Sequence, residues 1–312
     1  TFHAPPQPFR LALDAERLRL ASPAVPLPAA NIARLHLLPH SVEAVYGYMI
    51  PQPRIRHLMA HDAGAGKTIM GGLLCKELAS REPELRTLIV APAALTVQWQ
   101  REMREKFLVE FEIVDREQLR ENGQIWSASP RLITSLPFAR QADVVATLGN
   151  ARWDLVIVDE AHTCAKPSGA AASQQQRFHL LSRLAKKPDQ RLVLLTATPH
   201  SGKAEEFHSL LGLLDPKYET LDLPNASNAE RKQLAGHFIQ RKRADVAQWM
   251  GENTPFPERE ATEWAYDLGN DYRVFFNDIL AFARKLIAPD AEGRGHKRVQ
   301  YWTALALLRG VM

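Results

Sequence analysis

The stretch His61-Asp62-Ala63-Gly64-Ala65-Gly66-Lys67-Thr68 decides the fold that we predict for this chain. An apolar run over 55–60 precedes it and predicts a buried strand, and a helical pattern runs from Thr68 to Leu78. A strand, a glycine-rich turn, Lys-Thr and a helix in this order are typical of a phosphate-binding loop. The glycines let the backbone curl so that its N–H groups face an anion, and the helix start adds partial positive charge. An ordinary βα turn is the structural alternative.

Two side chains of this loop and a second motif indicate nucleotide chemistry. Lys67 is placed to reach the β- and γ-phosphates of a nucleotide, and the Thr68 hydroxyl is placed to ligate Mg²⁺. Asp159-Glu160-Ala161-His162 follows the apolar run at 155–158. Asp159 at a strand end can hold the metal, Glu160 can polarise an attacking water, and His162 can connect this site with a neighbouring loop. A helix-capping acid followed by a hydrogen-bonded histidine is the alternative.

Further apolar runs predict an α/β fold with a central, mostly parallel sheet and helices on both of its faces, because short Val/Ile/Leu strands alternate with helical stretches. The runs lie at 87–92, 110–114, 131–135, 155–158 and 191–195. Thr196-Ala197-Thr198 follows the last run, so two hydroxyls lie at a strand end, although a plain turn explains the tripeptide alone. Open α/β sheets bind ligands at such strand ends.

The length and composition of the chain limit the classes of protein to which it can belong. The chain has 312 residues, enough for one large domain or two modest ones, with 46% hydrophobic and 24% charged residues. The net charge of +4 permits nucleic-acid binding without showing it. Cys75 and Cys164 lack metal-ligand spacing and indicate a reducing compartment, which predicts a cytoplasmic protein. No apolar run approaches the roughly 18 residues of a membrane span. The chain starts at Thr1 and stops within a helical pattern, so we expect a piece of a longer protein.

The chain divides into three predicted parts. Residues 1–35 are proline-rich and form an N-terminal arm, either packed on a larger body or disordered. Residues 36–215 form the nucleotide-binding lobe. The strand pattern ends after Asp215, so 216–312 are predicted as a helical region, with a basic helix over 231–249 and amphipathic helices over 267–288 and 299–312.

A set of motifs, in order along residues 36–312, resembles the first RecA-like lobe of superfamily 2 helicase-like ATPases. The motifs are Pro39-His40, Gly64-Ala65-Gly66-Lys67-Thr68, Ala91-Pro92 with Gln98-Trp99, Thr134-Ser135, the DEAH box Asp159-Glu160-Ala161-His162, and Leu195-Thr196-Ala197-Thr198-Pro199. The segments 206–216 (EFHSLLGLLDP) and 238–246 (FIQRKRADV) resemble blocks of the Snf2 branch that ordinary RNA helicases lack. Residues 305–312 resemble the helix that leads to a second lobe. A narrower likeness, through residues 43–49, is to the RapA-like group and to DrmD-like components of DISARM anti-phage systems.

The resemblance implies roles for particular residues. ATP and Mg²⁺ would be the ligands, and the nucleotide would contact His40, Gly64, Ala65, Gly66, Lys67 and Thr68. Thr68 and Asp159 would hold the metal, with Glu160 as the base. His162, Thr196 and Thr198 would couple hydrolysis to movement. A DNA backbone would lie along Pro92, Thr96, Thr134 and Ser135, since small hydroxyls and helix N-termini suit phosphate contacts. Trp99 could lie there too, but core packing is the favoured interpretation.

The resemblance therefore predicts the ATP-binding half of a double-stranded DNA translocase. The partners that it implies are double-stranded DNA, a second RecA-like lobe and other proteins of a defence or remodelling complex. An RNA-directed helicase of the same superfamily and a non-catalytic DNA-binding or partner-docking module are the alternatives. Two departures stand out: His61-Asp62 replaces the usual acidic pair, and Ser41 replaces the glutamine that reads adenine. The second lobe, with its arginine finger, is not in these residues, so we expect them alone to bind ATP weakly and hydrolyse it barely at all. The basic segments 231–232, 241–243 and 294–298 are expected to be solvated helix faces, with DNA contact as the alternative.

Overall fold

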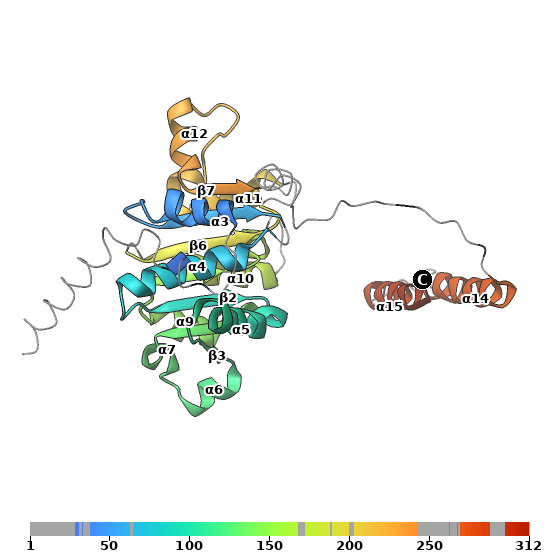
Figure 1. Ribbon diagram of the computed structural model, residues 1–312. Helices are drawn as coiled ribbons and strands as arrows, with labels where there is room; N and C mark the ends of the chain where they lie inside the picture. The colour runs from blue at the N-terminus through green and yellow to red at the C-terminus, as the bar shows by residue number, and fades with distance from the viewer. Residues whose placement is uncertain are drawn as a thin grey trace, which may run out of the picture. The chain divides into compact units, whose positions relative to one another are not determined.

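The computed structural model describes residues 29–30, 33, 38–62, 65–167, 172–187, 189–199, 203–241, 262, 267, 269–287 and 297–311. The chain forms two compact units, Thr1–Phe256 and Pro257–Met312, which Figure 1 draws. The predicted arm lies almost entirely outside the described residues, as do Gly64 of the phosphate loop and most of the segment 242–268.

The first unit is built on a seven-stranded sheet in the order β3-β4-β2-β5-β6-β1-β7, and every strand pair is parallel. The strands are β1 (Arg56–His61), β2 (Thr87–Ala91), β3 (Glu112–Val114), β4 (Arg131–Ser135), β5 (Leu155–Val158), β6 (Arg191–Thr196) and β7 (Phe238–Arg241). The predicted α/β fold and its parallel sheet are confirmed. The parallel order brings the ends of β5, β6 and β1 side by side at one edge.

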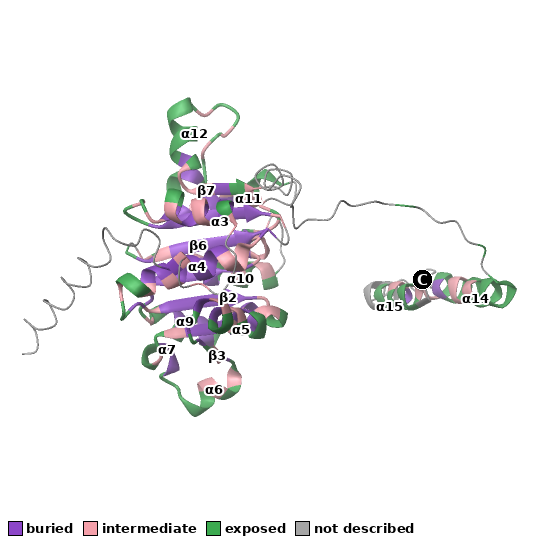
Figure 2. Ribbon diagram, in the orientation of Figure 1, coloured by how far each residue is buried: buried purple, intermediate pink, exposed green. Residues whose placement is uncertain are grey.

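Helices cover both faces of this sheet, because neighbouring residues of each strand point to opposite faces. Leu58 and Leu88 belong to one apolar cluster, whereas Met59 and Ile89 belong to the other. The face of Met59 is covered by α3 (Pro39–Val42), the π-helix η1 (Glu43–Met49), α4 (Lys67–Arg81) and α5 (Thr96–Phe107). The face of Leu58 is covered by α7 (Ile125–Ala128), α8 (Leu136–Ala139), α9 (Ala142–Asn150), α10 (Ala172–Ala185) and α11 (Ala204–Leu214). Figure 2 shows the strands as the buried centre of the unit.

The shorter elements complete this unit at its periphery. They are η2 (Ala93–Leu95), α6 (Arg116–Glu121), η3 (Ala161–Cys164), η4 (Pro216–Tyr218) and α12 (Asn228–Ala235). Two of the helices start with reciprocal caps: Asp115 with Gln118 on α6, and Ser227 with Glu230 on α12. Each cap satisfies backbone donors that a helix start leaves without a partner.

The strand β7 was not predicted. Phe238–Arg241 pairs with Leu58–His61 of β1, so the prediction that strands end after Asp215 is wrong at this segment. Only Ile239 of β7 is buried. An edge strand has a neighbour on one side only and tolerates polar and basic residues, so its apolar pattern is weak. The basic helix predicted over 231–249 is wrong in most of its described part: 231–235 lie in α12, which ends at Ala235, and 238–241 form β7, while 242–249 lie outside the described residues.

The second unit is described as two helices, α14 (Asn270–Ile287) and α15 (Lys297–Val311), which pack on each other. The two amphipathic helices predicted at 267–288 and 299–312 are confirmed. Ala283 and Ala304 are buried, and small residues at such positions let two helices approach closely. In the described part of the chain, no helix combines the length and apolar character that a membrane span needs.

Candidate active site

The strand and the helix that flank the predicted phosphate loop are present, and the loop itself is described except at residues 63–64. The buried strand β1 ends at His61, and α4 begins at Lys67. Gly66 precedes the helix with a φ of 83°, in the left-handed region that favours glycine. The Ala65 N–H donates to the Asp62 carbonyl (3.0 Å), which closes the turn. The loop therefore directs the start of α4, with its unpaired N–H groups and positive end, toward the edge of the sheet.

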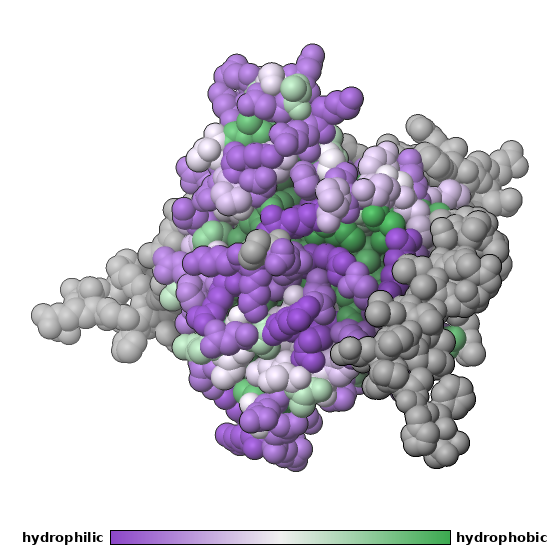
Figure 3. Space-filling view, turned by 90° about the vertical axis from the view of Figure 1, so that its left-hand side faces the viewer, coloured by the Kyte–Doolittle hydropathy of each residue, from purple (hydrophilic) through white to green (hydrophobic). Residues whose placement is uncertain are grey.

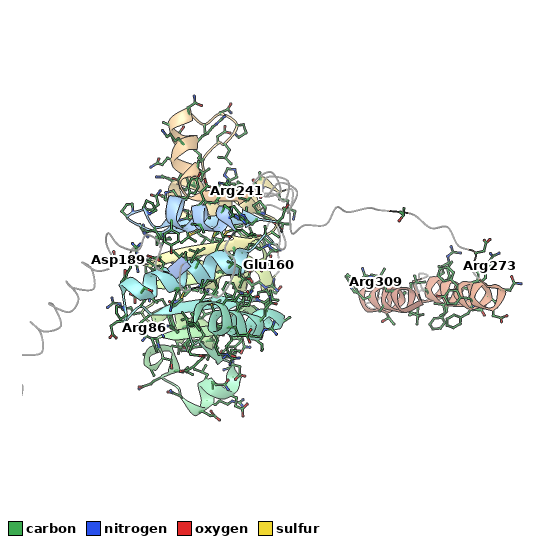
Figure 4. All side chains as sticks on the ribbon, in the orientation of Figure 1. Arg86, Glu160, Asp189, Arg241, Arg273 and Arg309 are labelled. Carbon is green, nitrogen blue, oxygen red and sulfur yellow. The ribbon has the colours of Figure 1, made fainter. Side chains whose placement is uncertain are left out.

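The structure brings Lys67 together with the two predicted carboxylates. The Lys67 Nζ donates to the His61 carbonyl at 3.0 Å. Burial raises the pKa of Asp159 and the His162 contact lowers the pKa of Glu160, and the positive charge of Lys67 adds a smaller lowering effect on each carboxyl. These residues come from β1 and β5, separated in the sheet by β6. Figure 4 shows Glu160 at one end of the strands, with Arg86 and Asp189 at the opposite end.

Asp159 directly follows β5 and is buried, with both carboxylate oxygens hydrogen-bonded. The Trp99 indole N–H donates to Oδ2 (2.9 Å), and the Glu160 backbone N–H donates to Oδ1 (2.9 Å). Burial raises the pKa of Asp159, while these two hydrogen bonds oppose that change. The carboxylate is thus held in one orientation.

Glu160 has an unusual backbone conformation, with φ at 49° and ψ at 45°. A non-glycine residue in this region carries strain, and such strain concentrates at functional sites. Its carboxylate contacts the His162 ring, Oε2 to Nδ1, at 3.2 Å. This contact is the main cause that lowers the pKa of Glu160, so its carboxylate stays ionised at neutral pH.

His162 links Glu160 to the end of β6. Its Nδ1 lies 3.0 Å from the Thr196 hydroxyl oxygen. A carboxylate only accepts hydrogen bonds, so Nδ1 carries the proton, and this one N–H is shared between the Glu160 carboxylate and the Thr196 hydroxyl oxygen. The Thr196 hydroxyl then accepts from the Thr198 N–H (3.1 Å) and donates to the Thr198 carbonyl (3.1 Å). The four predicted residues therefore form one connected chain of hydrogen bonds.

The predicted nucleotide residue His40 lies on α3, over the loop. Its Nε2 lies 3.2 Å from the Ala65 carbonyl oxygen, and a Cβ on Gly66 would lie 3.6 Å from the Ser41 hydroxyl. His61 is buried beneath this helix, and burial, assisted by nearby positive groups, lowers its pKa to about 3. His61 is therefore a neutral residue of the interior at neutral pH.

The predicted DNA contacts divide into half-buried and buried residues. Pro92 and Ser135 are half-buried, whereas Thr96, the first residue of α5, is buried and its hydroxyl donates to the Ala93 carbonyl (3.1 Å). The prediction for the Thr134 side chain is wrong, because it is fully buried and its hydroxyl donates to the Val114 carbonyl (3.0 Å). This bond helps to hold β3 against β4.

Two contacts of the site were missed or only partly foreseen. The bond from Trp99 to Asp159 joins residues 60 positions apart, and no spacing in the sequence indicates it. Arg241, expected on a solvated helix face, lies on β7 instead and pairs with Glu43 on η1 (3.1 Å). The Asp62 N–H donates to the Arg241 carbonyl (3.4 Å), so β7 contacts both the loop and the helix beside it.

A cavity of about 560 Å³ lies at the opposite edge of the sheet, lined in part by Glu82, Arg86 and Asp154. Its polar groups are used within the fold: Asp154 accepts the Arg86 backbone N–H (2.9 Å), and Glu82 pairs with Arg191. Figure 3 shows a mainly hydrophilic face on this side of the molecule. The residues predicted to bind the nucleotide lie at the other edge.

Comparisons with known proteins agree with this geometry. The family described as the SNF2-related domain matches residues 51–222. An uncharacterized ATP-dependent helicase, YqhH of Bacillus subtilis, is 31% identical over 57% of this chain and 29% of its own length. The RNA polymerase-associated protein RapA of Pectobacterium atrosepticum is 33% identical over 59% of this chain and 19% of its own length. The chain thus spans less than a third of these curated relatives.

Solved structures share the fold. The SWI2/SNF2 ATPase core of Sulfolobus solfataricus, solved in complex with dsDNA, matches with a TM-score of 0.56 at 17% identity, over 89% of this chain and 58% of that chain. The same organism's SWI2/SNF2 ATPase core domain matches with a TM-score of 0.53 at 18% identity, over 93% and 60%.

Proposed function

Because this chain belongs to the SNF2-related family and carries its helicase-like ATPase domain, we propose that it is the ATP-binding half of a motor that moves along double-stranded DNA. The observation that carries the proposal is geometric: Lys67 follows β1, Asp159 and Glu160 follow β5, and only β6 separates these parallel strands, so the three side chains lie at the same edge of the sheet. A cation for phosphates, a carboxylate for a metal and a second carboxylate as base are the parts that phosphoryl transfer requires.

The residues present suit Mg²⁺ bound together with ATP. In the part of the chain that is described, no three His, Cys, Asp or Glu side chains gather to hold a metal by themselves. Mg²⁺ needs no such cage, since it uses one or two protein oxygens, water and substrate phosphates. Thr68 and Asp159 supply oxygens of this kind. An ion held by these two residues would supply positive charge to neutralise the phosphate oxygens.

Different side chains of the protein would perform the separate steps of ATP binding and hydrolysis. Lys67 would leave the His61 carbonyl and take the phosphates, which are stronger partners for its charge. Glu160, kept ionised by its contact with His162, would accept the proton of the attacking water. Departure of the phosphate would change the charge beside Glu160, and the bonds through His162 to Thr196 would carry that change to the end of β6.

DNA would contact the same edge through its backbone. The start of α5, at Thr96, and the capped start of α8, at Ser135, are helix N-termini that suit phosphate oxygens. Support comes from the Sulfolobus core of the same fold, whose structure was solved with dsDNA. Such contacts read the backbone and not the bases, so binding would be independent of sequence and sensitive to salt.

The test is ATP hydrolysis by the full-length protein with and without duplex DNA, compared with Glu160→Gln. We expect duplex DNA to stimulate hydrolysis, and Glu160→Gln to lower the stimulated rate by at least about 10² while ATP still binds. The matched control is Glu105→Gln, which changes an exposed glutamate on α5 in the same way and should leave the rate unchanged.

The same assay separates the alternatives. Stimulation by duplex RNA in place of duplex DNA would indicate an RNA-directed helicase. Full biological activity of Lys67→Ala in the full-length protein would indicate a non-catalytic docking module and overturn the proposal. Lys76→Ala, on the same helix, is the control for effects on α4 stability.

The biological setting is a separate proposal. Several relatives are named RNA polymerase-associated protein RapA, which favours a partner in transcription. A role in anti-phage defence rests on the likeness of residues 43–49 alone. Co-purification of the full-length protein with RNA polymerase, and phage plating with and without its gene, would distinguish these settings.

A further inference from the structure

Trp99 joins three parts of the proposed site. It lies on α5, is 1% exposed, and donates its indole N–H to Asp159 Oδ2 at 2.9 Å. Its ring also packs on α4, the helix that begins at Lys67. A Cβ on Gly71 of that helix would lie only 3.1 Å from Trp99 Cη2, which is closer than a side-chain carbon normally approaches. One side chain therefore contacts both the phosphate-loop helix and the metal-binding carboxylate.

The same helix begins at the surface proposed to meet DNA. Thr96 is the first residue of α5, and Val97 and Gln98 beside it are exposed, Val97 by 65%. Trp99 follows within the first turn but points into the interior. A rigid helix moves as one body, so a backbone contact at its exposed start shifts the indole N–H at the same time.

We propose that Trp99 is a positioning residue for ATP hydrolysis: its N–H fixes the Asp159 carboxylate toward Mg·ATP, and its place on α5 makes this orientation respond to DNA. The inference rests on the proposed function for its DNA part. The Asp159 part concerns nucleotide binding alone and is tested separately.

The hydrogen bond, and not only the ring, carries this role. Phenylalanine would still fill much of the space but has no N–H, so one oxygen of a buried carboxylate would lose its partner. Outer partners that orient a metal ligand typically contribute 10- to 100-fold in metal affinity or activity. Because the Glu160 N–H still holds Asp159 Oδ1, we expect the loss of Mg²⁺ affinity to be nearer 10-fold than 100-fold.

The experiment compares Trp99→Phe with Trp153→Phe in the full-length protein. Trp153 is also buried and donates its indole N–H, to the Leu148 carbonyl at 3.2 Å, but lies in the other apolar cluster. Binding of a non-hydrolysable ATP analogue is measured by calorimetry at stepped Mg²⁺ concentrations without DNA. We expect Trp99→Phe to raise the half-saturating Mg²⁺ concentration about tenfold, and Trp153→Phe to leave it unchanged.

Gly71→Ala provides a second, independent variant. Its methyl group would displace the Trp99 ring, although residue 99 would still be a tryptophan with its indole N–H. We expect it to raise the Mg²⁺ requirement in the wild-type background and to have little further effect in Trp99→Phe, since the shorter ring does not reach Gly71. This non-additivity is the signature of two residues acting through one contact.

The outcomes are distinct. An unchanged Mg²⁺ requirement in Trp99→Phe, with a loss of stability equal to that of Trp153→Phe, would overturn the inference and leave Trp99 as core packing. A wild-type protein that binds Mg·ATP but is not stimulated by duplex DNA would overturn the proposed function instead. A Trp99→Phe protein with a raised Mg²⁺ requirement and at least a several-fold lower DNA stimulation ratio supports both parts.

Discussion

At the scale of single residues, the site depends on backbone conformations that few residues adopt. Gly66 has a φ of 83° and Glu160 a φ of 49°. The first is free of strain because glycine has no Cβ, whereas the second is strained and is held by its contacts to His162. The two conformations turn the chain sharply after β1 and β5, which is how both strand ends present their groups to one ligand.

Gly66→Ala should weaken the phosphate loop. A left-handed conformation costs a non-glycine residue about 1–2 kcal/mol, so we expect a comparable loss of free energy of unfolding or a distorted loop with weaker ATP binding. Urea unfolding and calorimetric ATP binding measure the two effects. Gly123→Ala is the control, because a Cβ there meets nothing within 4 Å, and it should change stability by less than about 0.5 kcal/mol.

At the scale of elements, the start of β1 is anchored by a buried arginine. Arg56 donates to the Leu213 carbonyl (2.8 Å) at the end of α11 and to the Ala185 carbonyl (2.6 Å) at the end of α10. Helix ends leave carbonyls without partners, and their partial negative charge favours a cation. Arg56 thus fixes two helices against the strand that leads into the phosphate loop.

Arg56→Met should destabilise the fold by about 3 kcal/mol, because several buried carbonyls lose a charged donor. Urea unfolding monitored by circular dichroism measures the change. Arg54→Met, two residues earlier and exposed, provides the control and should be nearly neutral. Equal stability of the two variants would contradict this account of Arg56.

The strand β1 also makes stability depend on pH. His57 is buried, faces the His237 ring with centroids 5.8 Å apart, and has its pKa lowered to about 4, chiefly by burial. In the unfolded chain, His57 therefore binds a proton below about pH 6.5, whereas in the folded chain it stays neutral until the pH falls to about 4. Stability should be fully present above pH 6.5 and fall by about 1.4 kcal/mol per pH unit as the pH drops through this window.

Urea unfolding at pH 7.5 and pH 5.0 tests this dependence. His57→Leu should show a smaller loss between the two pH values than the wild-type protein. Buried His61, with a pKa lowered to about 3, contributes in the same direction, so part of the dependence remains. His179→Leu, at an exposed position, should keep the full dependence.

At the scale of the whole molecule, the proposed ATP site is expected to be one side of a larger one. The chain spans 29% of YqhH and 19% of RapA, and the resemblance places an arginine finger in a second lobe. Residues 1–312 alone should therefore hydrolyse ATP at least about 10³-fold more slowly than a protein with both lobes, and bind it weakly. Steady-state ATPase assays of both proteins with duplex DNA measure the difference. A fast, DNA-stimulated rate for residues 1–312 would refute this prediction.

Most of the fold was predictable because its signals are local. Six strands coincide with the runs, rich in apolar residues, that the sequence predicts as strands, and the helices at 270–287 and 297–311 follow amphipathic patterns. The strand β7 was missed because three of its four residues are not buried, so its pairing with β1 leaves little trace in composition. Thr134 was misjudged because a hydroxyl at a strand end looks the same in sequence whether it faces solvent or a neighbouring strand.

The sequence by itself determined the chemistry of this protein: a cation and a hydroxyl after one strand, and two carboxylates after another. The order of the strands and the direction of each side chain were decided only by the tertiary structure. Trp99 shows the difference, since its bond to Asp159 exists because β2 and β5 are neighbours and α5 packs over them. The physical reason is that residue type sets which interactions a group can make, whereas packing of the whole sheet and its helices sets which partner lies within reach.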